Sequence, residues 1–245
     1  MIKKIFFLLC LVVSFFQVRS QDVPTPRSKK IDITDRPKDH FVMQFGIVNW
    51  LQRPDTFATK GFSRTIGLYL MYDLAFKTDP RFSIGVGAGI GSDHVFFDKT
   101  AGRDLVINGA DGIQFRNLTA AEASVKYKSI KLHTAYLEAP VEFRFMHKPQ
   151  QPNKSFKVAL GMKIGTLITA VDKTRFERDA SGNGPYNMKI KSRTNFNNLR
   201  LAASARIGYG NFGAFVQYQL NDFIKEGRGP NQIRPLQIGI TISGL

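Results

Sequence analysis

The stretch FSIGVGAGIG, from Phe82 to Gly91, alternates apolar side chains with small ones. Successive side chains of a β-strand point to opposite faces, so a period of two predicts a strand, whereas a helix would mix the two sets on every face. The glycines do not indicate a nucleotide-binding loop, because no helix follows the stretch. The apolar positions are Phe82, Ile84, Val86, Ala88 and Ile90.

The same alternation recurs along the rest of the chain. Phe156 to Thr166 is the next clearest case, with Val158, Leu160, Met162 and Ile164 on one face. We expect eight strands in all, at about 41–47, 66–76, 82–91, 137–145, 156–166, 199–207, 212–220 and 236–242.

The connections between these strands alternate in length. The long ones span roughly 51–61, 98–128, 171–195 and 222–234, and the short ones are 77–81, 147–154 and 210–211. Outer-membrane barrels have short periplasmic turns and long outside loops. The sequence therefore predicts an all-β fold, an eight-stranded antiparallel up-and-down transmembrane β-barrel over residues 40–245. An even strand number places both termini in the periplasm.

The side chains opposite the apolar residues indicate whether the apolar face points to the protein interior or to lipid. In a soluble sandwich or lipocalin the apolar face points inward, whereas in a membrane barrel it meets lipid. The opposite face here carries glycines and interleaved charges, which suit the narrow interior of a small barrel. We expect these charges to form an ion network that fills the lumen, in which Glu138 and Glu142 pair with Lys157 and Lys163 of the neighbouring strand, although a charged pore or binding site is the alternative. The network residues are Glu138, Glu142, Arg144, Lys157, Lys163, Arg200 and Arg206.

The N-terminal segment has the pattern of a secretory signal peptide. Lys3 and Lys4 precede an apolar run of about 12 residues, which is short of the roughly 20 that a spanning helix needs. We expect residues 1–20 to be a signal peptide, with a membrane-anchoring helix as the alternative. Residues 21–39 are polar and rich in proline, so we expect a flexible periplasmic segment.

Charge and cysteine content narrow the function classes. Cys10 is the only cysteine, so the mature chain would have no disulfide and no thiolate metal site. The net charge of +16 falls to +13 once Lys3, Lys4 and Arg19 are removed. A positive balance indicates anionic partners, and export makes nucleic acid unsuitable. We therefore expect outer-membrane lipid and lipopolysaccharide as partners, with the basic loop 171–195 either meeting lipopolysaccharide phosphates or simply solvated.

Two local motifs resemble a known family. YLEAPVEFRF, from Tyr136 to Phe145, and GMKIG, from Gly161 to Gly165, are similar to the small outer-membrane β-barrel domain family of the Bacteroidota, also called PorT-like or porin-family. The resemblance implies a barrel inserted by the barrel-insertion machinery. Such chains usually end on an aromatic residue, whereas this one ends on Leu245. The secretion role behind the PorT name is not implied.

Catalytic and metal-binding patterns are weak. His40, His94, His133 and His147 have no metal-ligand spacing. Ser92, Asp93, His94 and Asp98 fall near a barrel rim, where a catalytic group or ordinary solvated side chains are both consistent with the sequence. We expect no enzyme, no cofactor, no metal and no catalytic residue. We expect aromatic residues in girdles at the membrane interfaces, among them Trp50, Tyr69, Tyr72, Tyr136, Tyr209 and Tyr218.

These observations together predict an integral outer-membrane protein. We expect a structural, adhesion or envelope-complex role, with the lumen closed by charged side chains. The alternative is a narrow pore or an accessory component of protein secretion or transport across the outer membrane.

Overall fold

The computed structural model describes residues 39–52, 62–97, 103–108, 112–117, 126–178, 184–230 and 232–243. All of them belong to the compact unit Ile33–Leu245. The expected signal peptide 1–20, nearly all of segment 21–39, and Asp98 lie outside the described residues. Among the described residues, no helix is long and apolar enough to cross a membrane. The one helix described there is the short 3-10 turn η1, Pro152–Lys154.

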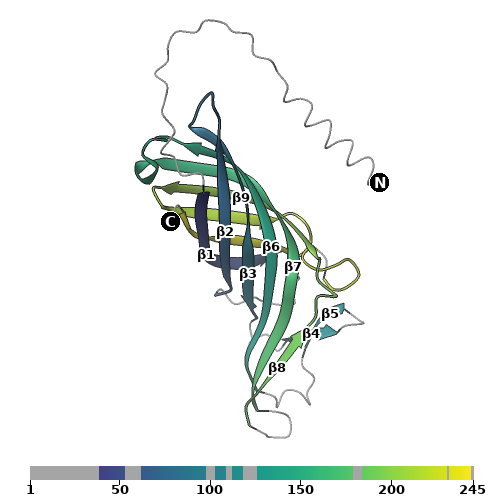
Figure 1. Cartoon of the computed structure of the whole chain (residues 1–245). Coiled ribbons are helices and arrows are strands. Elements are labelled where there is room, and N and C mark those ends of the chain that lie inside the picture. Colours follow the sequence, from purple (N-terminus) through teal and green to yellow (C-terminus); the bar gives the residue numbers. More distant parts are fainter. Residues whose placement is uncertain are drawn as a thin grey trace, which may run out of the picture. The chain divides into compact units, whose positions relative to one another are not determined.

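Eight strands close into a ring (Figure 1). Each pairs antiparallel with the next ring strand along the chain, and the last pairs with the first. The ring of eight strands is therefore closed, and the expected eight-stranded, up-and-down antiparallel ring is confirmed. In ring order the strands are β1 (Asp39–Leu51), β2 (Arg64–Ala75), β3 (Phe82–Phe96), β6 (Lys126–Met146), β7 (Phe156–Arg178), β9 (Leu199–Tyr209), β10 (Phe212–Gln219) and β11 (Arg234–Ser243).

Three more strands lie within the stretches expected to be loops. β4 (Arg103–Asn108) and β5 (Gly112–Asn117) pair with each other, and β8 (Tyr186–Lys191) pairs with the end of β7. The expectation that 171–195 is a loop is therefore wrong over much of its length. The register shifts where Tyr136 faces Leu167 but Ala135 faces Thr169. This bulge reverses the alternation of β7, so the period of two is interrupted although the strand continues.

The outward face of the ring carries an apolar belt. Leu70 is 69% exposed and Ile240 is 60% exposed, and no charged side chain occupies an outward position between the belt residues on the described strands. All eight ring strands contribute to this surface. The belt comprises Ile47, Ile66, Leu68, Leu70, Ile84, Ile90, Leu137, Val141, Phe143, Leu160, Met162, Ile164, Leu199, Ile207, Val216, Ile238 and Ile240.

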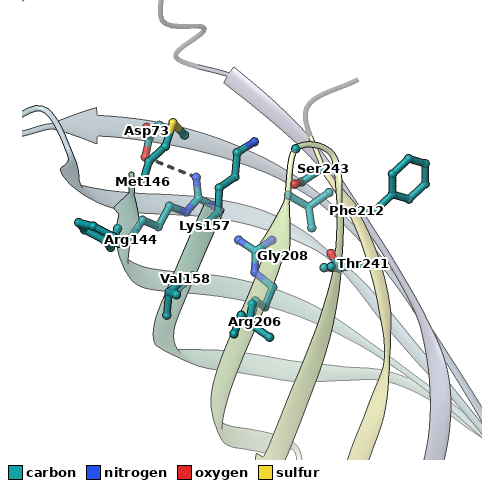
Figure 2. Close-up of a pocket in the computed structure, with 16 residues that line it drawn as sticks. Asp73, Arg144, Met146, Lys157, Val158, Arg206, Gly208, Phe212, Thr241 and Ser243 are labelled. Carbon is teal, nitrogen blue, oxygen red and sulfur yellow. Dashed lines mark hydrogen bonds and ion pairs between the residues drawn. The ribbon is translucent and has the colours of Figure 1, made fainter. Parts of the chain in front are cut away.

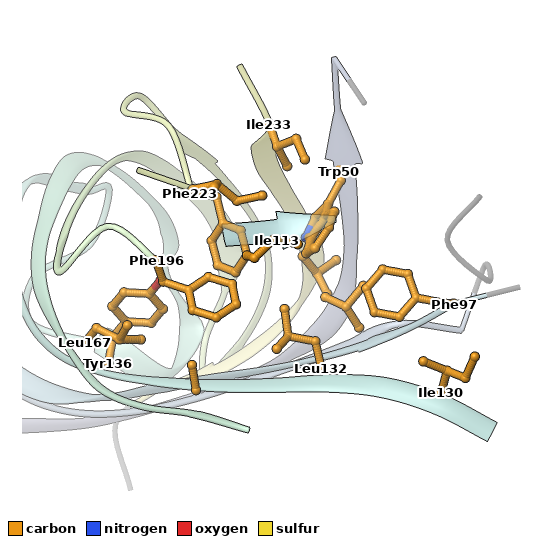
Figure 3. Packing of buried hydrophobic residues seen from close by; sticks show 14 residues of the cluster. Trp50, Phe97, Ile113, Ile130, Leu132, Tyr136, Leu167, Phe196, Phe223 and Ile233 are labelled. Atoms are coloured by element: carbon orange, nitrogen blue, oxygen red, sulfur yellow. The ribbon is translucent and has the colours of Figure 1, made fainter. Parts of the chain in front are cut away.

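The inward face holds an apolar cluster at the end of the ring that carries the long connections (Figure 3). The Trp50 ring lies 5.1 Å from the Phe223 ring and 5.6 Å from the Phe97 ring, measured between centroids. We call this cluster the apolar plug. It comprises Val48, Trp50, Val95, Phe97, Ile113, Ile130, Leu132, Tyr136, Leu167, Ala170, Phe196, Phe223, Ile224 and Ile233.

The expected girdle positions of Trp50, Tyr69 and Tyr136 are wrong, because all three side chains are buried inside the ring. Trp50 shares its strand face with Val42 and Val48, which are also buried, rather than with the outward residues of β1. Strand parity therefore places Trp50 inside, despite its position at the end of the strand.

Candidate functional site

The interior between the two ends of the ring holds a fully buried ion cluster centred on Arg200. Its guanidinium lies 3.2 Å from Glu138 Oε1 and 3.0 Å from Asp93 Oδ2. The same group lies 4.8 Å from the centre of the Tyr136 ring. Gln237 Nε2 donates to Asp93 Oδ1 over 2.8 Å. Burying a cation is costly unless it is paired, and here two carboxylates from β3 and β6 supply that pairing.

Lys163 joins this cluster through neutral groups. Its ammonium donates to Gln44 Oε1 at 2.7 Å and to the Tyr69 hydroxyl at 2.9 Å. Tyr69 in turn donates to Glu138 Oε2 at 2.7 Å. A chain of hydrogen bonds therefore connects Lys163 to Glu138, and it ties together side chains from β1, β2, β6 and β7.

A second cluster lies nearer the short turns and centres on Glu142. Arg206 Nε and Arg144 Nε each donate to this carboxylate over 3.0 Å. Arg144 also reaches Asp73, whose Oδ1 lies 3.5 Å from Nη1 (Figure 2). The cluster borders a cavity of about 60 Å³, which Lys157 also lines. Such a space has room for a few water molecules.

The side chains proposed from the sequence as a lumen network thus fall into three places. Glu138, Lys163 and Arg200 belong to the first cluster. Glu142, Arg144 and Arg206 form the second cluster. Lys157 lines the cavity beside it.

The pairing within these clusters differs from the expected one. We expected Glu138 and Glu142 to pair with Lys157 and Lys163 on the neighbouring strand. The register instead sets Glu138 opposite Gly165 and Glu142 opposite Gly161. Both carboxylates therefore reach past β7 to arginines of β9.

Sequence reasoning missed several members of these clusters. Asp73, Tyr69, Gln44 and Gln237 were not identified, and Asp93 was expected at a rim rather than in the interior. Strand parity would have found Asp73 and Asp93, because each shares its strand face with interior glycines: Gly67 in β2, and Gly85 and Gly91 in β3.

Of the residues considered as a catalytic group, Ser92, Asp93 and His94 do not come together, and Asp98 lies outside the described residues. Ser92 Oγ lies 2.9 Å from His133 Nε2, and the rings of His94 and His133 stack at 4.3 Å. Asp93 faces the opposite side of the sheet, where Arg200 binds it. Among the described residues, no group of three or more His, Cys, Asp or Glu side chains could hold a metal ion.

No family model matches the chain, and no curated protein matches it. Among solved structures, the chain is similar to Ail, the attachment invasion locus protein of Yersinia pestis, with 11% identity over 84% of this chain and 95% of Ail and a TM-score of 0.34. For Ail in complex with the heparin analogue sucrose octasulfate the values are 12%, 84%, 96% and 0.31.

Proposed function

We propose that this chain is an integral outer-membrane β-barrel protein with a closed interior and a structural, adhesion or envelope-complex role. The observation that carries the proposal is that charged side chains face the interior of the ring and apolar side chains face outward, which is the reverse of a soluble protein. Arg200, Glu138 and Asp93 form salt bridges inside, while the apolar belt lies outside. A soluble protein rarely exposes an apolar patch above a few hundred Å², whereas a belt around every strand matches a lipid surface.

Closure of the sheet supports the same proposal. Lipid offers no hydrogen-bond partner to a strand edge, so a sheet that crosses a membrane has to close on itself. The belt-bearing part of each strand, for example residues 135–145 of β6, is the proposed membrane-spanning segment. The long connections are proposed to lie outside the cell. β1 begins and β11 ends at the short-turn end of the ring, so both termini are proposed to be periplasmic.

The filled interior favours a non-conducting barrel over a pore. The apolar plug occupies one end of the interior, and the two ion clusters follow it toward the short turns. A solute would have to displace buried salt bridges and apolar side chains to pass. This arrangement favours a role that uses the outer surface and loops over the alternative of a narrow pore or a secretion component.

Two measurements test the proposal. The full chain, expressed in a Gram-negative host, should fractionate with the outer membrane, and its gel migration should change on heating, as for a closed barrel. The purified protein should show no stable single-channel current in planar bilayers. A soluble periplasmic location with heat-independent migration would contradict the membrane assignment, and large steady currents would contradict the closed interior.

A further inference from the structure

Three lysines stand side by side on the outward face at the long-connection end. Lys131 of β6 is opposite Lys173 of β7, and Lys173 is opposite Lys189 of β8. Cross-strand partners point to the same face, and like charges directly opposite each other destabilise a sheet. The repulsion within this row of lysines therefore destabilises the sheet unless a bound anion offsets it.

A second row of aligned side chains lies beside the first on the same face, with a cation at each end. In this second row, two residues nearer the belt on β6, Arg64 of β2 lies opposite His94 of β3, and His94 lies opposite His133 of β6. His133 lies opposite Val171 of β7, and Val171 lies opposite Lys191 of β8, so Lys191 ends this second row. We call the cations of this surface the basic strip, which comprises Arg64, Lys131, Lys173, Arg175, Lys189 and Lys191.

The charges of the strip act on one another. Lys131 lies outside the proposed spanning part of β6, and burial together with the nearby charges of Lys173, Arg175 and Arg64 lowers its pKa. Among the described residues, no acidic side chain forms a salt bridge with the strip. The acidic Asp93 and Asp172 are buried toward the interior, and Glu177 is the exposed acid next along β7.

The strip borders the apolar belt. Arg64 is two residues from Ile66 on the same face of β2, a rise of roughly 7 Å. On the outward face of β6, His133 and Ala135 separate Lys131 from Leu137. The strip therefore begins at the depth where headgroups meet acyl chains and continues away from the belt. It is at the end with the long connections, which is the outer-leaflet side in the proposed topology.

We propose that the basic strip binds the phosphate groups of lipopolysaccharide while its acyl chains lie against the apolar belt. This inference rests on the proposed function, because it requires the belt to be in lipid. Arg and Lys are the side chains that recognise phosphate, and several of them in register match a polyanionic headgroup. The adjacent belt explains why the ligand is a lipid rather than a free anion.

The test uses purified, refolded protein in neutral detergent micelles. The strip variant is Lys131→Gln/Lys173→Gln/Lys189→Gln, and the matched control is Lys77→Gln/Lys148→Gln/Lys154→Gln, which removes the same charge from exposed lysines of the short turns. Binding is titrated with purified lipopolysaccharide, with its dephosphorylated form and with phosphatidylglycerol. The strip variant should bind lipopolysaccharide at least tenfold more weakly than the wild type, whereas the control should stay within about twofold.

Several outcomes would overturn the inference. These are wild-type affinity in the strip variant, equal binding of dephosphorylated lipopolysaccharide, equal binding of phosphatidylglycerol, or displacement by inorganic phosphate at the same phosphate concentration. Removing like charges should not unfold the variant, and heat-modifiable migration checks this. A wild type that lacks such migration would instead refute the proposed barrel. A folded barrel with no phosphate-dependent binding refutes only the lipid site.

Discussion

The Glu138 carboxylate and the Arg200 guanidinium lie 3.2 Å apart, although β6 and β9 are not neighbours in the ring. Gly165 of β7 stands opposite both residues in the register. A Cβ atom at Gly165 would lie 3.0 Å from Glu138 Cγ and 3.6 Å from Arg200 Cβ. The glycine therefore leaves the space through which the two charged side chains meet.

Gly165→Val should destabilise the barrel, because the added side chain would occupy that space. We expect a loss of about 1–3 kcal/mol in the free energy of unfolding, as for other overpacked interiors. Gly184→Val is the matched control, since a Cβ atom at Gly184 would meet no atom within 4 Å. Urea titration of both variants in detergent checks the difference. Equal stability of the two variants would show that Gly165 is not required for the ion pair.

Glu142→Gln should leave Arg206 and Arg144 without their shared carboxylate. Removing one partner of a buried pair costs about 3–5 kcal/mol, and because the adjoining cavity is large enough to admit water, we expect a loss near the lower value. Glu177→Gln is the control, because Glu177 is exposed. Unfolding of both variants by urea measures the loss. If the Glu142→Gln variant is as stable as its control and shows new ion currents, the closed interior is contradicted and a pore is supported.

Phe196→Ala should remove a fully buried part of the apolar plug, since Phe196 is 0% exposed and packs 5.1 Å from the Phe223 ring. A buried phenylalanine truncated to alanine costs about 3–5 kcal/mol. Phe212→Ala is the control, because that side chain is 71% exposed on the outward face. Thermal unfolding in the same detergent should rank the variants accordingly. A larger loss at Phe212 would indicate that the plug contributes little to stability.

The sequence predicted the ring well because its strands alternate so regularly. In β2 and β3 the period of two runs for the whole strand, so the eight ring strands and the order of short and long connections could be predicted. The alternation fails at Leu167 and Thr169, where the bulge changes the phase. For this reason the period of two does not predict the continuation of β7 to Arg178.

The interior was harder to predict because closure brings distant strands together. The charged residues were identified by parity, but the pairing of Glu138 with Arg200 depends on a ring whose curvature carries one side chain past Gly165. Sequence order supports pairing between adjacent strands only, and that rule predicts that Glu138 pairs with Lys163. The apolar plug was missed because Trp50 was assigned by its position near a strand end rather than by its face.

Single cysteines can test the proposed topology, because Cys10 in the expected signal peptide is the only native cysteine. Gly184→Cys, next to β8, should react with a membrane-impermeant maleimide on intact cells. Lys154→Cys, in a short turn, should react only after the outer membrane is permeabilised. Labelling of Lys154→Cys alone on intact cells would invert the assignment of the two ends.

The apolar belt carries the central claim, and Leu160 tests it most directly. Leu160 is 58% exposed on the outward face of β7, so Leu160→Arg would have little effect in a water-soluble protein. Against lipid, an arginine near mid-bilayer costs about 2–4 kcal/mol. Gln150→Arg, in the exposed turn before η1, is the matched control. The decisive measurement is the free energy of folding of both variants into phospholipid bilayers. A loss of about 2–4 kcal/mol for Leu160→Arg alone supports lipid contact, whereas equal stability of the two variants would contradict it.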